Sequence, residues 1–132
     1  MIVVDSSAIV AVMRGEPEAN GFAGMLDQES DVLMSAVSLV ETNMVIAGRR
    51  AEAEPLQIAS LIGALGITIS EVTLEQANLA VTAFLRYGKG RHRASLNLAD
   101  CFSYALAKSR NAPLLYKGDD FSQTDIAAAW RP

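Results

Sequence analysis

The sequence contains only one cysteine, Cys101, and one histidine, His92, among its 132 residues. A single cysteine excludes an internal disulfide and a metal site built from several thiolates, so we interpret Cys101 as a buried structural thiol. A single histidine excludes a metal-free acid–base mechanism that uses two histidines. Because no Gly-x-Ser-x-Gly motif is present either, the sequence does not resemble a serine hydrolase of the α/β-hydrolase type.

Long apolar runs are also lacking, although 51% of the residues are hydrophobic. No run approaches the roughly 18 residues that span a bilayer. The N-terminus has no basic segment ahead of an apolar one, as a signal peptide would have. We therefore expect a cytoplasmic protein. From the length of the chain, we expect residues 1–132 to form a single domain.

Basic residues are outnumbered, 11 against 15 acidic ones, and the net charge of −4 argues at first against a nucleic-acid partner. The basic residues are, however, concentrated. Residues 76–118 contain seven of them and one acid, Asp100, for a net charge of +6, whereas the remainder carries −10. This asymmetry predicts a local polyanion-binding face on an acidic molecule, and the alternative is a solvated basic loop and helix end.

Short β-branched runs alternate with helical patterns along the whole chain. This order predicts an α/β fold with three layers, in which helices cover both faces of a mostly parallel sheet of four or five strands. We expect strands at residues 1–5, 32–34, 67–69 and 113–116, and helices at 6–14, 17–28, 35–50, 55–65, 73–87 and 97–109. The tail from residue 124 fits an edge strand or a short helix.

Several polar residues are expected to begin these helices. Ser6 or Ser7 fits the N-cap of the first helix, and Ser38 with Glu41 three residues later fits a capping box. Residues 73 and 76, Thr and Gln, fit a second capping box ahead of an apolar stripe that ends at Gly88. The members of that stripe are Ala77, Ala80, Val81, Phe84 and Leu85.

Acidic residues recur at the ends of the predicted elements. Asp5 ends the first strand, Glu41 and Asp100 lie near helix starts, and Asp119 and Asp120 follow the last core strand. In a parallel α/β sheet these positions share one edge, so the acids can converge. Carboxylates that converge need a compensating cation, and oxygen ligands favour Mg²⁺ or Mn²⁺. Two such ions about 3.5–4 Å apart commonly serve hydrolysis of phosphodiesters.

Each acid also has a purely structural interpretation. Asp5 could cap the first helix, and Glu41 could serve only a capping box with Ser38. Asp100 could be the third residue of a helix capped by Asn97, where the helix dipole favours an acid. The two aspartates after the last strand could be ordinary turn residues.

Five segments together resemble a VapC-type toxin of the PIN-domain ribonuclease family. The resemblance runs in order along nearly the whole chain. The segments are IVVDSSA at residues 2–8, SLVET at 38–42, YGKGRHR at 87–93, LNLADCFSYA at 96–105 and LLYKGDDF at 114–121. The resemblance implies a PIN-like three-layer α/β/α domain and a Mg²⁺- or Mn²⁺-dependent endoribonuclease.

The same resemblance assigns roles to the acids. It implies that Asp5, Glu41 and Asp100 coordinate the metal, and that a further acid follows the last core strand. Asp119 and Asp120 are both candidates for it; from its register with Phe121 we favour Asp120 as the fourth catalytic acid and keep Asp119 as an outer ligand. The family places a small hydroxyl residue near its first aspartate, so Ser6 or Ser7 is expected to orient Asp5, and we favour Ser7 as the supporting residue.

The resemblance also implies partners. These are a second copy of the chain, an RNA substrate (tRNA, rRNA or mRNA) and a VapB-like antitoxin that forms a hetero-oligomer with the toxin. When free of antitoxin, such a toxin would cleave RNA and inhibit translation and growth. We expect the loop residues Lys89, Arg91, His92 and Arg93 to hold the RNA backbone, with Arg49 and Arg50 as further candidates.

Two rival functions remain open at this point. One is a non-catalytic protein-binding module, in which the acids only cap helices. The other is a structure-specific DNA nuclease of the same fold.

Overall fold

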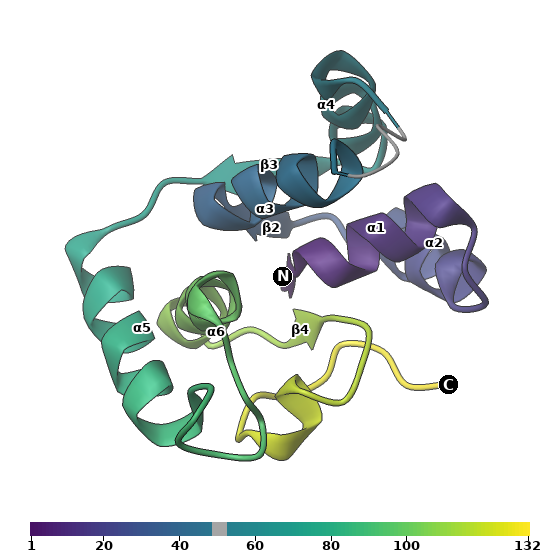
Figure 1. Ribbon diagram of the computed structural model, residues 1–132. Coiled ribbons are helices and arrows are strands. Elements are labelled where there is room, and N and C mark those ends of the chain that lie inside the picture. The colour runs from purple at the N-terminus through teal and green to yellow at the C-terminus, as the bar shows by residue number, and fades with distance from the viewer. Residues whose placement is uncertain (49–52) are drawn as a thin grey trace.

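The structure is a computed structural model of the chain, in which residues 1–48 and 53–132 are described (Figure 1). Arg49 and Arg50, two of the predicted RNA contacts, lie outside the described residues. The elements are β1 (Ile2–Val4), α1 (Ser6–Arg14), α2 (Ala19–Gln28), β2 (Val32–Ser35), α3 (Ala36–Ile46), α4 (Pro55–Ala64), β3 (Ile67–Ser70), α5 (Leu74–Tyr87), α6 (Leu98–Arg110), β4 (Leu114–Leu115) and the 3₁₀ helix η1 (Phe121–Gln123).

The four strands form one sheet in the order β3-β2-β1-β4, and all neighbouring strands are parallel. Val3 pairs with Leu33 on one side and with Leu114 on the other, so β1 lies inside the sheet. A central strand of a parallel sheet is buried on both faces, which is why β1 is apolar throughout. Ala128 forms an isolated bridge with Leu114, so the tail extends the β4 edge by one contact.

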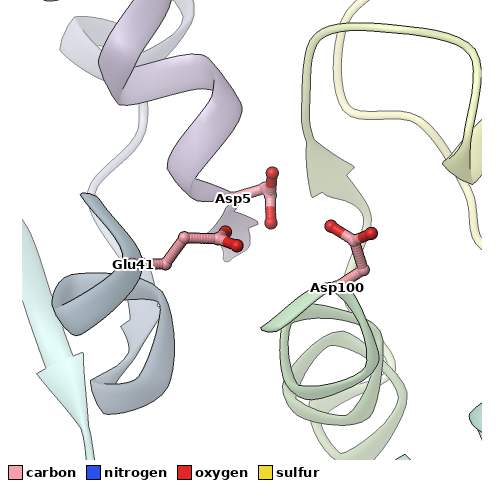
Figure 2. Close-up of side chains that lie close together, drawn as sticks. All are labelled: Asp5, Glu41 and Asp100. Carbon is pink, nitrogen blue, oxygen red and sulfur yellow. The ribbon is translucent and has the colours of Figure 1, made fainter. Parts of the chain in front are cut away.

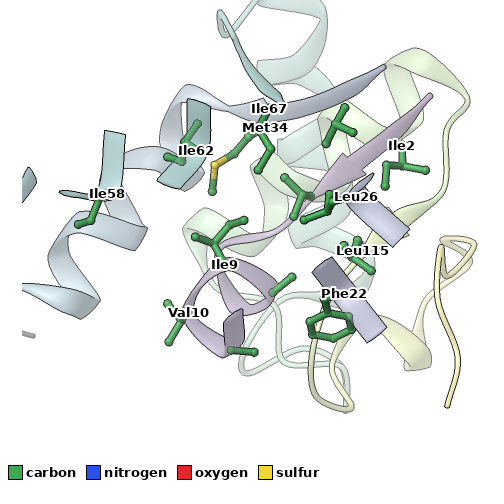
Figure 3. Packing of buried hydrophobic residues seen from close by; sticks show 14 of the residues in the cluster. Ile2, Ile9, Val10, Phe22, Leu26, Met34, Ile58, Ile62, Ile67 and Leu115 are labelled. Carbon is green, nitrogen blue, oxygen red and sulfur yellow. The ribbon is translucent and has the colours of Figure 1, made fainter. Parts of the chain in front are cut away.

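Two hydrophobic clusters lie on opposite faces of this sheet. Ile2 and Val4 belong to the cluster that contains the buried side chains of α1, α2 and α4 (Figure 3). Val3 belongs to the second cluster, which contains those of α5 and α6. Successive strand residues point to opposite faces, so β1 supplies both clusters. Figure 1 shows α5 and α6 on the other side of the sheet from α1 and α2. The predicted three-layer α/β/α fold with a parallel sheet is thus confirmed.

The predicted helix starts are correct in part. Thr73 caps α5 as predicted, accepting a hydrogen bond from the backbone N–H of Gln76 at 3.1 Å. The side chain of Gln76 is buried, however, and does not complete a capping box. The helix predicted from residue 17 begins at Ala19, so Pro17 lies in the preceding turn.

Two predicted caps are wrong. The cap of α1 is Asp5 rather than Ser6 or Ser7, because β1 ends at Val4 and the helix starts at once. The cap of α3 is Ser35, the last residue of β2, whose hydroxyl accepts from the N–H of Val37. Ser38 therefore lies inside the first turn of α3 and is fully buried.

The apolar stripe of α5 does not face the core as a unit. Ala80 is buried together with Ala83 and Tyr87, whereas Val81 and Leu85 are 59% and 55% exposed. The middle of the buried face consists of the two alanines, which let α5 pack closely against α6. The larger apolar residues face outwards, and Figure 1 shows α5 at the edge of the molecule.

No helix in residues 1–48 or 53–132 is long and apolar enough to cross a membrane.

Candidate metal centre

Three carboxylates meet at the edge of the sheet where β1 ends. Asp5 follows β1, Glu41 lies on α3 and Asp100 lies in the first turn of α6. One carboxylate oxygen from each residue lies within 4.8 Å of the other two. Figure 2 shows the three side chains pointing toward a common space from three separate elements. Within the described part of the chain, this cluster is the arrangement of acids that fits a metal ion.

Asp5 is 2% exposed, and both of its carboxylate oxygens accept hydrogen bonds from the protein. Oδ2 accepts from the backbone N–H of Ser7 at 3.0 Å, which caps α1. Oδ1 accepts from the hydroxyl of Ser103 at 2.6 Å. A carboxylate offers about four lone-pair directions, so these two bonds leave acceptor capacity for a cation.

Glu41 is held by Ser6, whose hydroxyl donates to Oε1 of the carboxylate. Burial raises the pKa of Glu41, the Ser6 hydrogen bond opposes this effect, and the negative charge of Asp5 raises the pKa further. The predicted capping box of Ser38 and Glu41 is wrong, because α3 begins one turn earlier at its Ser35 cap. The side chain of Glu41 thus serves the acidic cluster and not the helix end.

Asp100 forms a capping box with Asn97, as its structural interpretation predicted. Asp100 Oδ2 accepts from the N–H of Asn97 at 3.0 Å, and Asn97 Oδ1 accepts from the N–H of Asp100 at 2.9 Å. Burial is the main cause that raises the pKa of Asp100 from 3.8 to about 7, against the lowering effect of the Asn97 bond. The negative charges of Asp5, Glu41 and Asp120 raise it further.

The causes of the raised pKa of Asp100 indicate whether these residues fit a cation. The charged groups that act on the pKa of Asp100 are all carboxylates. Close carboxylates without a compensating positive charge repel one another, and a divalent cation between them removes the repulsion. The donor set consists of carboxylate oxygens, which is the set that Mg²⁺ and Mn²⁺ prefer. The residues therefore fit a hard divalent ion.

The fourth acid is less closely placed. Asp120 immediately precedes η1 and is exposed, and its charge acts on Asp100, but it is not part of the three-residue cluster. Asp119 is also exposed, and its backbone carbonyl accepts from the hydroxyl of Ser122 at 2.7 Å. Of the two candidates, Asp120 is the one whose charge acts on Asp100.

Comparison with known proteins identifies the family of this chain. Residues 2–127 match the family described as PIN domain. The chain is 42% identical over 131 residues to ribonuclease VapC30 of Mycobacterium tuberculosis, and the alignment covers 99% of this chain and 100% of that protein. The chain belongs to the VapC family of PIN-domain proteins. It is also 42% identical over 127 residues to a ribonuclease VapC of Mycolicibacterium smegmatis, covering 96% of this chain and 98% of the relative.

Solved structures of low sequence identity share the fold. The crystal structure of Mycobacterium tuberculosis VapC20, described as a sarcin–ricin loop cleaving toxin, matches with a TM-score of 0.79 at 18% identity. A toxin–antitoxin complex from Klebsiella pneumoniae matches with a TM-score of 0.71 at 18% identity. Both alignments cover 100% of this chain and of the compared chain. The PIN-like fold predicted from the sequence is therefore shared with these two structures over the whole length of this chain.

Ser7 reaches Asp5 through its backbone rather than its hydroxyl. The backbone N–H of Ser7 donates to Oδ2 of Asp5, while its hydroxyl accepts from the backbone N–H of Lys117 at 3.0 Å. That bond joins the start of α1 to the segment after β4. Of Ser6 and Ser7, Ser6 is the one whose hydroxyl contacts an acid of the cluster, namely Glu41.

The basic loop of this VapC protein joins α5 to α6 and leads directly to the α6 cap. Lys89 and Arg93 are exposed. Arg91 is exposed too, and its Nε donates to the carbonyl of Leu85 at 3.3 Å. His92 is half-buried, and its Nδ1 accepts from the N–H of Ala94 at 3.0 Å. Three cationic side chains are thus presented to solvent next to the helix that carries Asp100.

Two further residues lie at the site without a signal in the sequence: Ser103, to which no motif assigns a role, and Ser38, whose spacing from Glu41 predicts only a helix cap. Both hydroxyls are buried; that of Ser103 contacts Asp5, and that of Ser38 contacts Ser103. The two serines are 65 residues apart in sequence, and no local pattern connects them.

Proposed function

We propose that this protein is a metal-dependent endoribonuclease that acts as the toxin of a toxin–antitoxin pair, with residues 1–132 forming one PIN domain. The observation that carries the proposal is the cluster of three carboxylates at the carboxyl end of β1. The ribonuclease names of relatives at 42% identity over nearly the full chain support the same reaction.

In this proposal Asp5, Glu41 and Asp100 hold Mg²⁺ or Mn²⁺, Asp120 is the fourth catalytic acid, and Asp119 is an outer ligand. A divalent ion bound there supplies positive charge that stabilises the charge developing at the scissile phosphodiester. Asp100 has to lose its proton to act as a ligand, and its raised pKa makes this step depend on pH near neutrality. Ser7 supports Asp5 through its backbone N–H.

The RNA backbone is held in this proposal by the loop between α5 and α6. Lys89, Arg91 and Arg93 are exposed there and offer charge to phosphates. His92 supports the loop, since its ring packs edge-on against Tyr87 at 5.1 Å and accepts from Ala94. Phosphate contacts position RNA without reading its sequence, so tRNA, rRNA and mRNA are all substrates to test.

The proposal includes a VapB-like antitoxin and a homodimer as partners. An open groove of about 490 Å³ beside Glu41 supports partner binding, because exposed apolar residues line it. Val40, Met44 and Leu98 are 57%, 69% and 75% exposed on its walls. An antitoxin segment seated there would lie against one acid of the cluster.

Cleavage by purified, antitoxin-free protein tests the function. Labelled tRNA, rRNA and mRNA are incubated with Mg²⁺ or Mn²⁺, with EDTA, and with the variants Asp5→Asn and Asp100→Asn. Asp27→Asn, an exposed aspartate of α2, is the matched control. We expect cleavage by wild type and Asp27→Asn with a metal ion, and loss of cleavage in all other arms.

The rival functions predict different results when flap DNA is added as a further substrate to this assay. Cleavage that survives both EDTA and the two substitutions would contradict the metal mechanism. Cleavage of flap DNA in preference to every RNA favours the DNA nuclease, and no cleavage of any nucleic acid favours the protein-binding module.

A further inference from the structure

Ser38 and Ser103 form a buried hydroxyl pair behind the acidic cluster. Ser38 lies on α3 and Ser103 on α6, and both are 0% exposed. Their Oγ atoms are 2.8 Å apart. The hydroxyl of Ser103 also lies 2.6 Å from Oδ1 of Asp5. The pair therefore connects the two helices that carry Glu41 and Asp100 with the carboxylate of Asp5.

The hydrogen bonds of this pair have a defined direction. A serine hydroxyl has one proton to donate, and a carboxylate can only accept. Ser103 donates its proton to Asp5, so its oxygen has to accept the proton of Ser38. The order of donation is Ser38 to Ser103 to Asp5, and each hydroxyl in such a chain polarises the next one.

On each of the two helices, the serine lies three residues from the acid of the cluster. Ser38 precedes Glu41 by three residues and Ser103 follows Asp100 by three residues, so each serine lies one helical turn from an acid. A shift of α3 against α6 would break the Ser38–Ser103 bond. It would also change the distance between the two acids.

Helix packing alone does not require a hydroxyl at residue 103. Three of the other buried residues of the same helix are alanines, namely Ala99, Ala105 and Ala107, and an alanine at residue 103 would fill the same space apart from the hydroxyl. A buried hydroxyl is unfavourable unless its hydrogen bonds are made, so the serine is best explained by the bond that it donates.

We propose that Ser103, supported by Ser38, is a positioning residue that orients the Asp5 carboxylate for a divalent cation. Ser103 fixes Oδ1 while the N–H of Ser7 fixes Oδ2, so the carboxylate is held from both sides. This inference rests on the metal site proposed above. Hydrogen-bond partners of metal ligands commonly account for 10–100-fold in metal affinity.

The dissociation constant of Mn²⁺, measured by titration calorimetry without RNA, tests this role. We expect Ser103→Ala to weaken binding about 10–100-fold, and Ser103→Thr, which keeps the hydroxyl, to restore most of the affinity. The matched control is Ser109→Ala on the same helix, because the Ser109 hydroxyl donates only to the carbonyl of Leu106. Metal-free unfolding of each variant shows separately what the substitution does to the fold.

A double-mutant cycle tests whether Ser38 acts through Ser103. Ser38→Ala should weaken Mn²⁺ binding less than Ser103→Ala, and the double variant should match Ser103→Ala. Independent effects that multiply would overturn the relay, and equal affinity of Ser103→Ala and wild type would overturn the positioning role. If wild type itself binds no Mn²⁺, the proposed metal site has failed instead.

Discussion

Replacing Asp100 by Asn should have opposite effects on stability in the absence and presence of a metal ion. Burial and three neighbouring carboxylates raise the pKa of Asp100 to about 7, so the metal-free folded protein binds a proton that the unfolded chain releases near pH 4. A group with a raised acidic pKa lowers stability as pH rises between its two pKa values. Asparagine carries no charge and removes this penalty.

The size of the effect follows from the pKa shift. Between pH 5 and pH 8 the ionisation of Asp100 lowers the free energy of unfolding by at most about 2.7 kcal/mol, because each pH unit from 5 up to the folded pKa of about 7 costs about 1.36 kcal/mol. Asp100 is partly exposed, and solvent screening reduces the expected value to about 1.3 kcal/mol. Metal-free wild type should therefore lose about this much more stability than Asp100→Asn over this pH range.

Adding Mn²⁺ should reverse the order of stability. An ion at about 100 times its dissociation constant stabilises wild type by about 2.7 kcal/mol, and Asp100→Asn gains less because it lacks a ligand. Urea unfolding of both proteins and of Asp27→Asn at pH 5 and pH 8, with EDTA or Mn²⁺, measures these differences. Equal pH slopes together with equal stabilisation by Mn²⁺ would refute the argument and leave Asp100 as a capping residue only.

Three further predictions concern the fold and the basic loop. A Cβ at Gly21 of α2 would lie 2.6 Å from the ring of Trp130, so Gly21→Ala should lower the free energy of unfolding in urea by about 1–3 kcal/mol. Gly24 in the same helix has open space around it, so Gly24→Ala should raise the free energy of unfolding by about 0.5–1 kcal/mol. Leu106→Ala should cost about 2–5 kcal/mol, because Leu106 is fully buried in α6; a smaller loss would show that the core closes over the cavity. Arg93→Gln should reduce the slope of log RNA affinity against log salt by about 0.7–1, and an unchanged slope would exclude Arg93 from the phosphate contacts.

The order of strands and helices could be predicted from sequence because the strands are short β-branched or apolar runs that helical patterns separate from one another. The meeting of Asp5, Glu41 and Asp100 also follows from this order, since a parallel sheet brings strand ends and helix starts to one edge. The helix caps were harder to predict. Ser35 and Ser38 are both good cap residues, and only the length of β2 decides which of them begins α3.

Which face of a helix is buried depends on its partner. The apolar residues of α5 have helical spacing, yet Val81 and Leu85 face solvent while Ala80 and Ala83 face the core. Hydrophobicity alone ranks the larger residues as the core face. Close packing against α6 selects the smaller ones instead, and the sequence of α5 carries no direct record of that neighbour.

The structural and the metal-binding interpretations of Asp5 and Asp100 turn out to be compatible. Asp5 uses Oδ2 to cap α1, and Asp100 uses Oδ2 to complete the capping box of α6. In each residue the hydrogen bond that satisfies a backbone N–H near the helix start also fixes the direction of the carboxylate. Asparagine at residue 5 keeps an oxygen acceptor for the cap and loses the charge. Loss of ion binding in a folded Asp5→Asn variant would therefore report the ligand role of Asp5 and not a failure of α1 to form.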